Sequence, residues 1–242
     1  MNPFKNYLDE KKIAWVELSN TTILVTKWNW PYAEALEAQK MAIQFVKENP
    51  KEKVLFFCNH PHVYTLGRGL QKSGGKVLPD LVDFSEDDKL KLGFELFKIN
   101  RGGGLTFHCP SQWIIYPIIN LNIQAWSLSK HYHWILGETT KALQHLGIKS
   151  CHYDIGHAGI WNEGSKLGSI GVGIERFVTC HGLALNVLED NVMMNDFSKT
   201  NPCGLRPTIY KSVDQFLPNA ISVEEFNEVV KAKTDLLKQE IF

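Results

Sequence analysis

Runs of apolar side chains and their alternation with polar ones predict many short strands along this chain. The predicted strands cover residues 13–18, 22–26, 54–57, 97–99, 113–119, 159–161, 166–174 and 177–187, with tight turns at 162–164 and 175–176. Residues 113–119 form the most strand-like run, although Pro117 within it argues for an edge strand or a bulge. Strands that outnumber helices and follow short turns favour a mixed sheet flanked by helices over a doubly wound parallel sheet.

Apolar residues recur at helical spacing in three other stretches. Pro31 begins the first predicted helix, which Asn49 and Pro50 end. The second begins at Ser127 or Ser129 and ends at Gly147. The third begins at the capping box of residues 222–225. These helices would bury their apolar stripes against the sheet.

The periodic pattern is lost between residues 58 and 92. Residues 58–69 are predicted to be a loop, and residues 70–92 are polar, with a short solvated turn or helix expected at 85–88. The chain shows no internal repeat, no low-complexity tract and no linker long enough to divide it. We therefore expect residues 1–242 to form a single domain.

Composition and charge restrict the class of protein. Of 242 residues, 44% are hydrophobic and 21% charged, which predicts a packed core. Lys and Arg number 26, as do Asp and Glu, so net charge indicates neither a nucleic-acid partner nor a membrane partner. There is no secretory signal and no apolar run of transmembrane length. Five scattered cysteines suit free thiols in a reducing cytoplasm.

Three runs carry candidate chemistry: residues 101–108 (RGGGLTFH), 166–172 (KLGSIGV) and 201–205 (NPCGL). Cys203 stands between Pro202 and Gly204, which predicts a reachable thiol on a turn. A free thiol ionises near pH ~8.5, so it needs a neighbouring cation to act at neutral pH. Lys166 is the strongest candidate for the cation that would stabilise the Cys203 thiolate. A nucleophilic sulfur, a cation and a glycine-rich cradle together indicate acyl transfer.

Each of these features also has a simpler interpretation. A lone cysteine is usually a buried apolar residue, and a lysine at a strand end usually extends into solvent. However, the glycines of residues 168–173 suggest that something approaches this strand's backbone closely. Gly102, Gly103 and Gly104 lack the Lys and Ser/Thr of a phosphate loop. We interpret them as a cradle for an acyl chain, with backbone N–H groups for an oxyanion.

Nine histidines invite a search for metal ligands. The pairs His60/His62 and His131/His133 resemble ligand pairs, but no Cys or carboxylate completes either set at a recognised spacing. We therefore predict no metal. His108 and His181 lie within glycine-flanked runs and would orient substrate or move a proton, unless they are core histidines.

The motifs together resemble the octanoyltransferases of protein lipoylation, members of the biotin/lipoyl protein ligase catalytic-domain superfamily. The matching blocks follow one another in the family's order between about residues 15 and 238: 60–68, 101–112, 116–117, 159–161, 166–172, 181–186 and 202–205. The chain departs from the family pattern at Phe107, where a tyrosine is usual, and at Cys109 and Ser111, where glycines are usual. These departures bear on acyl chain length.

The resemblance implies a fold and an activity. The fold is α/β (α+β), a single domain of mixed sheets flanked by helices. The activity is that of a lipoyl(octanoyl) transferase, which moves octanoyl from octanoyl-acyl carrier protein to a lysine of a lipoyl domain. Acceptors would be the E2 subunits of 2-oxoacid dehydrogenases and the glycine cleavage H protein. No cofactor is implied, and the protein would be a cytoplasmic monomer.

The resemblance also implies roles for individual residues. Cys203 would carry the acyl thioester, and Lys166 would lower the pKa of the Cys203 thiol and act in acid/base steps. The implied acyl-binding residues are Arg101, Gly102, Gly103, Gly104, Leu105, Thr106, Phe107, His108, Ser169, Ile170, Gly171, Gly182, Leu183 and Ala184, with His181 in support. Two alternatives stay open: an ATP-dependent lipoate or biotin ligase on the same fold, and a non-catalytic scaffold that binds acyl carrier or lipoyl domains.

Overall fold

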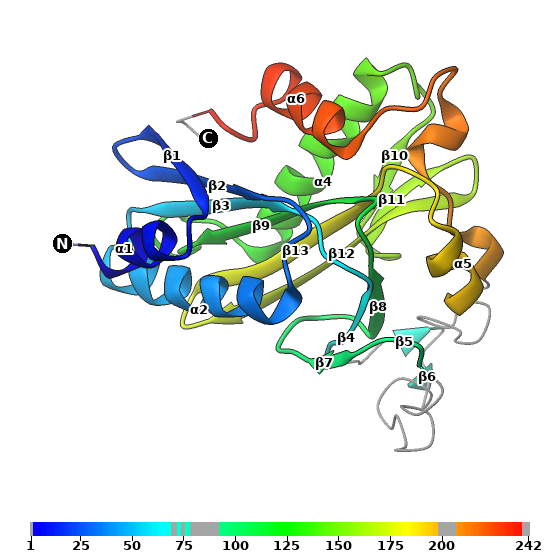
Figure 1. Cartoon of the computed structure of the whole chain (residues 1–242). Helices are drawn as coiled ribbons and strands as arrows, with labels where there is room; N and C mark the ends of the chain where they lie inside the picture. The colour runs from blue at the N-terminus through cyan, green and yellow to red at the C-terminus, as the bar shows by residue number, and fades with distance from the viewer. Residues whose placement is uncertain (1, 69–71, 74–75, 78–91, 198–206, 239–242) are drawn as a thin grey trace.

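The computed structural model describes residues 2–68, 72–73, 76–77, 92–197 and 207–238. A mixed sheet of eight strands spans the molecule (Figure 1). Its order is β1 (Ala14–Ser19), β2 (Thr22–Lys27), β3 (Lys53–Cys58), β9 (Gln112–Ile119), β13 (Val178–Asn186), β12 (Ser165–Glu175), β11 (Gly159–Asn162) and β10 (His152–Asp154). Neighbouring strands are antiparallel except β2 and β3, which are parallel. The predicted mixed sheet is confirmed.

Helices cover both faces of this sheet (Figure 1). Val54 and Phe56 of β3 pack with α1 (Pro3–Glu10) and α2 (Tyr32–Glu48) on one face. Leu55 and Phe57, the alternate residues, pack with α4 (Leu128–His145) and α6 (Val223–Lys233) on the other. All six residues of β3 are buried, because both of its faces lie under helices.

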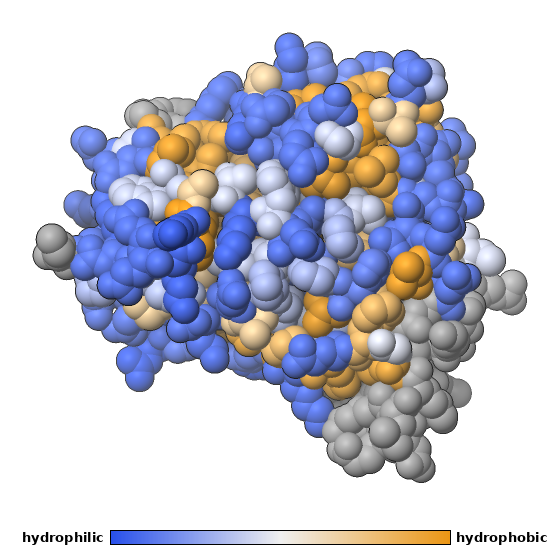
Figure 2. Space-filling model, viewed as in Figure 1, coloured by the Kyte–Doolittle hydropathy of each residue, from blue (hydrophilic) through white to orange (hydrophobic). Residues whose placement is uncertain are grey.

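A second, smaller sheet holds β7 (Leu96–Lys98), β4 (Val63–Leu66) and β8 (Leu105–His108), in that order. The strand β4 corrects the prediction of a loop over residues 58–69. It is short and flanked by loop-forming residues, yet it is fully buried because it pairs with both β7 and β8. Hydrophobic residues gather over this sheet in Figure 2, where Leu92, Phe94 and Leu96 are half-buried. A two-stranded sheet joins β5 (Lys72–Ser73) and β6 (Lys76–Val77).

Pro117 was predicted to mark an edge strand or a bulge. The edge strand was wrong, because Pro117 lies in a central strand, but the pairing with β13 is interrupted at the proline. β9 runs between β3 and β13, but its register with β13 extends only from Gln112 to Ile115. Beyond that point the Thr179 hydroxyl donates to Pro117 O at 2.7 Å and accepts from Ile119 N at 3.0 Å. The Thr179 side chain therefore replaces backbone hydrogen bonds between β9 and β13 near Pro117, which has no N–H to donate.

The helix ends follow the predicted capping chemistry. Ser127 accepts from Lys130 N at 3.1 Å to begin α4, and Gly147 with φ +108° follows its end. In α6 the capping box is complete: Glu225 N donates to Ser222 Oγ at 3.1 Å, and Ser222 N donates to Glu225 Oε2 at 2.7 Å.

Several elements were not predicted. The helix α1 begins where Asn2 Oδ1 accepts from Phe4 N at 3.0 Å, and it is mostly polar apart from buried Phe4 and Leu8. Late in the chain stand α5 (Asn191–Phe197), η3 (Pro207–Ile209) and η4 (Val213–Phe216). The turn or helix expected at 85–88 lies outside the described residues. Within the described ranges, no helix combines the length and apolar character needed to cross a membrane.

Candidate active site

Lys166 is the second residue of β12, and its side chain is directed into the protein. It is only 5% exposed, so the interpretation of a lysine extended into solvent does not apply. Its Nζ donates to His157 O at 2.9 Å and lies 5.5 Å from the centroid of the Trp161 ring. Trp161 is the residue directly opposite Lys166 on β11. The Nζ atom is thus held between a carbonyl oxygen and an indole ring.

Gly159 makes room for the lysine stem. A Cβ at this position would lie 2.7 Å from Lys166 Cε and 2.1 Å from Gly168 O. Any larger residue at 159 would displace either the lysine or the neighbouring strand. The sequence places Gly159 within a matching block, but its task becomes visible only in the pairing of β11 with β12.

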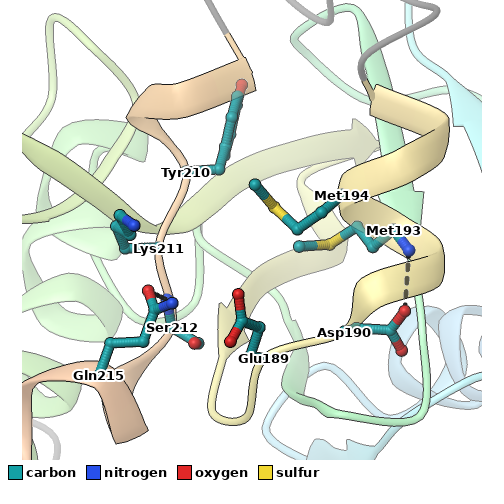
Figure 3. A pocket seen from close by; sticks show the side chains of 8 residues that line it. All are labelled: Glu189, Asp190, Met193, Met194, Tyr210, Lys211, Ser212 and Gln215. Carbon is teal, nitrogen blue, oxygen red and sulfur yellow. Dashed lines mark hydrogen bonds between the residues drawn. The ribbon is translucent and has the colours of Figure 1, made fainter.

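Cys203, the predicted nucleophile, lies outside the described residues. The described chain resumes at residue 207 and contacts Lys166. Tyr210 forms a parallel bridge with Lys166, and Lys211 N donates to Lys166 O at 3.1 Å. A small pocket is lined by Tyr210 and Lys211 and by Met193 and Met194 of α5, and Figure 3 shows Tyr210 and the two methionines on opposite sides of it. Glu189, Asp190, Ser212 and Gln215 complete its lining.

The other four cysteines are all buried free thiols: Cys58, Cys109, Cys151 and Cys180. Burial raises the pKa of Cys109 and Cys151 to about 12 and that of Cys180 to about 11, and it raises the pKa of Cys58 further. None of these four thiols is therefore a thiolate at neutral pH.

Arg101 organises the glycine loop from within. Its side chain is buried, and Nη2 donates to Thr65 O at 3.0 Å, Thr65 Oγ1 at 2.8 Å and Thr106 Oγ1 at 2.9 Å. Its Nη1 donates to Gly102 O at 2.9 Å. The guanidinium thereby joins the loop to β4 and β8, and several of its donors are engaged by the chain itself.

The glycine loop rests directly on β12. Gly102 N donates to Val172 O at 3.0 Å. A Cβ at Gly171 would lie 2.8 Å from Gly102 O, and one at Gly173 would lie 2.0 Å from Asn100 O. The close approach that the strand's glycines predicted is present, and at these two positions the approaching group is the chain's own loop.

The predicted acyl-binding runs lie together in the structure. Register between β12 and β13 sets Ser169 opposite Ala184, Ile170 opposite Leu183 and Gly171 opposite Gly182. The loop carrying Arg101 to Gly104 covers the Gly171 end of this strand pair. Leu105 and Phe107 of β8 pack in an apolar cluster with Tyr64, Leu66, Cys109, Met193 and Tyr210. This cluster connects the loop to both sides of the pocket in Figure 3.

Three buried imidazoles surround the base of the loop. Burial lowers the pKa of His60 to about 4 and that of His181 to about 3, and it lowers the pKa of His108 well below its usual range. His60 Nδ1 donates to Trp30 O at 2.7 Å, so its Nε2 accepts from the Tyr116 hydroxyl at 3.0 Å. All three rings are therefore neutral at physiological pH. The charged side chain near His108 and His181 is Arg101, which also disfavours their protonated forms.

The two members of each histidine pair have different surroundings. His62 Nε2 lies 3.0 Å from Asp190 Oδ2, while His60 bonds inward. The nitrogens of His131 have no hydrogen-bond partner, and His133 bonds Tyr153. Among the described residues, no group of three or more His, Cys, Asp or Glu side chains is placed to hold a metal ion.

Comparison with known proteins adds independent evidence. The family model of the lipoyl protein ligase A/B catalytic domain matches residues 31–235. An octanoyltransferase of Geobacter sulfurreducens is 35% identical over 201 residues, which are 83% of this chain and 78% of that protein. An octanoyltransferase of a Nostoc species is 32% identical over 226 residues, which are 92% of this chain and 95% of that protein.

Solved structures show the same fold at low sequence identity. A crystal structure of lipoate-protein ligase A bound with ATP superposes with a TM-score of 0.63 and 12% identity, covering 90% of this chain and 84% of that one. The likeness confirms the predicted fold. At this identity it says nothing of activity or of nucleotide binding.

Proposed function

The chain belongs to the octanoyltransferases of the lipoyl protein ligase A/B catalytic domain family, and on that premise we propose that it takes octanoyl from octanoyl-acyl carrier protein. The acceptor is a specific lysine of a lipoyl domain, in the E2 subunits of 2-oxoacid dehydrogenases and in the glycine cleavage H protein. The proposal includes a cytoplasmic monomer that needs no cofactor of its own.

One observation carries the assignment of the catalytic pair. Lys166 is buried with its ammonium held in place, and the chain that follows Cys203 forms a backbone bridge with it at Tyr210. The four other thiols are buried and their pKa values are raised. This arrangement supports a Cys203 thiolate near the Lys166 ammonium.

In the proposed reaction, the Cys203 thiolate attacks the octanoyl thioester carbonyl. A carbon–sulfur bond forms to Cys203, the bond to the phosphopantetheine sulfur breaks, and the leaving thiolate takes a proton. The neutral ε-amine of the acceptor lysine then attacks the acyl-enzyme. The amide forms, the Cys203 thiolate leaves, and Lys166 relays the proton released by the amine.

Both half-reactions pass through a tetrahedral oxyanion that needs hydrogen-bond donors. Gly102 N is engaged by Val172 O, so this N–H is not the donor that the glycine loop was expected to supply. The bond instead fixes the loop on β12. We propose that the loop shapes the acyl site together with Gly171 and Gly182, and that other N–H groups of the site bind the oxyanion.

The proposal is tested by incubating the purified protein with octanoyl-acyl carrier protein without ATP and measuring intact mass. We expect an octanoyl adduct on Cys203 that a lipoyl domain then discharges. Cys203→Ala should form no adduct, and Lys166→Met, which removes the charge at similar volume, should slow adduct formation at least about 100-fold. Cys151→Ala, at a buried thiol to which the proposal gives no chemical role, is the matched control and should behave like the parent.

The alternatives give different results in the same assay. Transfer that appears only when ATP is added would identify an ATP-dependent ligase. Transfer by Cys203→Ala without ATP would rule out the cysteine intermediate. Tight binding of the carrier protein without any adduct would identify a scaffold. Either a ligase or a scaffold would overturn the proposed transferase.

A further inference from the structure

Gln112 and Asn186 form a buried pair of amides at the ends of β9 and β13. They are directly opposite each other in the strand register, and they are only 4% and 6% exposed. Gln112 Nε2 donates to Asn186 Oδ1 at 3.0 Å and to Phe107 O at 3.2 Å. These two acceptors fix the orientation of the Gln112 amide and leave its Oε1 as an acceptor.

On one side this pair reaches the glycine loop. His108 Nδ1 donates to Gln112 Oε1 at 3.1 Å, which assigns the proton of the neutral ring to Nδ1. His108 Nε2 then accepts from the Thr65 hydroxyl at 3.4 Å, and that hydroxyl oxygen accepts from Arg101. The bonds thus lead from Gln112 to the guanidinium that holds the loop.

On the other side the pair reaches Lys166. Asn186 Nδ2 donates to Lys211 O at 3.2 Å, and Lys211 N donates to Lys166 O at 3.1 Å. The peptide groups around Lys211 therefore connect Asn186 to the backbone of Lys166. Hydrogen bonds therefore join the residues between Arg101 and Lys166, with the backbone of Lys211 as a covalent step.

We propose that Gln112 and Asn186 are positioning residues that set the glycine loop and Lys166 in fixed register with each other. The inference rests on the proposed function, since Lys166 and the loop are the parts it assigns to chemistry and acyl binding. Two buried amides with several shared bonds specify one geometry, whereas apolar residues of the same shape would tolerate several. Neither side chain touches substrate in this account.

Two isosteric variants break the connection at different links. Asn186→Asp keeps the acceptor for Gln112 and loses the donor to Lys211 O. Gln112→Glu keeps the acceptor for His108 and loses the donor to Asn186. We expect each to stay folded by circular dichroism and to lower kcat for octanoyl transfer at least about tenfold, with KM changed less than about threefold. Asn122→Asp, the same chemical change at an exposed site, is the control.

A second readout needs no octanoyl donor. The rate at which trace acetic anhydride acetylates Lys166 is measured against pH and compared with that of Lys149, an exposed lysine. We expect both variants to change the acetylation rate of Lys166 at least about threefold at one or more pH values. The rate at Lys149 should stay the same in both variants, and the rate at Lys166 should stay the same in the Asn122→Asp protein. A purely structural role would lower the melting temperature and leave the Lys166 profile unchanged.

The outcomes separate the two proposals. A parent protein that forms no acyl-enzyme defeats the proposed function, while the acetylation profile still decides on the positioning role. An unchanged Lys166 profile in both folded variants overturns the positioning role even if octanoyl transfer is confirmed. If the carboxylate of Asn186→Asp prevents folding, Asn186→Ala removes both side-chain bonds of this residue without adding a charge and is measured in the same way.

Discussion

His131 is a fully buried imidazole on α4 whose two nitrogens have no hydrogen-bond partner among the residues that the structure describes. Its neighbours are the rings of Trp126 and Trp134. Burial lowers the pKa of His131 to about 3. Below pH ~6.5 this histidine is protonated in the unfolded chain but stays neutral in the folded chain. Stability therefore falls as the pH is lowered from ~6.5 toward the pKa of the folded state. His60 and His181 act in the same direction, because burial lowers the pKa of each.

We expect His131→Leu to stabilise the protein. Removing a buried polar group without partners should raise the free energy of unfolding by about 1 kcal/mol at pH 7. At pH 5 the gain should grow by about 2 kcal/mol, because the variant no longer loses stability through this ring. Urea unfolding at both pH values measures the change. A gain that is the same at pH 5 as at pH 7 would contradict this account.

At the scale of elements, the glycines of β12 let the loop of residues 100–102 lie directly on the strand. Gly173→Ala would place a Cβ 2.0 Å from Asn100 O and 2.7 Å from Cys180 Sγ. Because the first of these is a backbone atom, the loop itself has to move. We expect a loss of about 2–4 kcal/mol in unfolding free energy and slower acyl-enzyme formation.

Gly137→Ala on α4 is the matched control for this prediction. Its Cβ would find ordinary contact at 3.8 Å from Tyr153 Cε1, and alanine favours a helix interior over glycine by up to about 1 kcal/mol. Thermal unfolding of both variants should therefore shift in opposite directions. A Gly173→Ala protein as stable as the parent would show that stability does not depend on the close contact between the loop and β12.

The sequence predicts those elements whose signals are local. Strands β11, β12 and β13 were found because turn residues separate runs of apolar alternation, and α6 because its capping box is contiguous. The strand β4 and the central place of Pro117 depend on which distant strands pair with them. Local pattern cannot supply that pairing.

The same division holds in the candidate site. Lys166 and the crowded glycines of β12 stood out from their flanking residues alone. Trp161 as the neighbour of Lys166, and the pairing of Gln112 with Asn186, required the strand register. The sequence also predicted close approach at Gly171 and Gly173 without indicating that the chain's own loop fills the space.

At the scale of the whole molecule, the family model begins at residue 31, yet the sheet begins earlier. The strands β1 and β2 precede that match, and β2 pairs along the whole length of β3. The helix α1 adds Phe4, whose ring stacks on Phe45 at 5.6 Å between centroids. The first thirty or so residues are therefore part of the fold that holds the site.

Deleting residues 2–28 should abolish cooperative folding. The deletion would make β3, whose six residues are all buried, an edge strand that pairs only with β9, and exposed apolar edge strands promote aggregation. Soluble yield and a circular dichroism melt measure the outcome. Val16→Thr, at a half-exposed position of β1, is the control and should melt like the parent. A soluble deletion variant with a parental melt would show that the segment is dispensable.

The close contact between the glycine loop and β12 restricts which sequence changes homologues can accept at this site. Because Asn100 O and Gly102 O occupy the space that side chains at 173 and 171 would need, loop and strand can change only together. Homologues that accept acyl chains of other lengths should therefore keep these contacts and vary elsewhere. We expect the differences between such homologues in the apolar cluster of Leu105, Phe107 and Met193. Exchange of one apolar residue for another of similar volume costs little stability there.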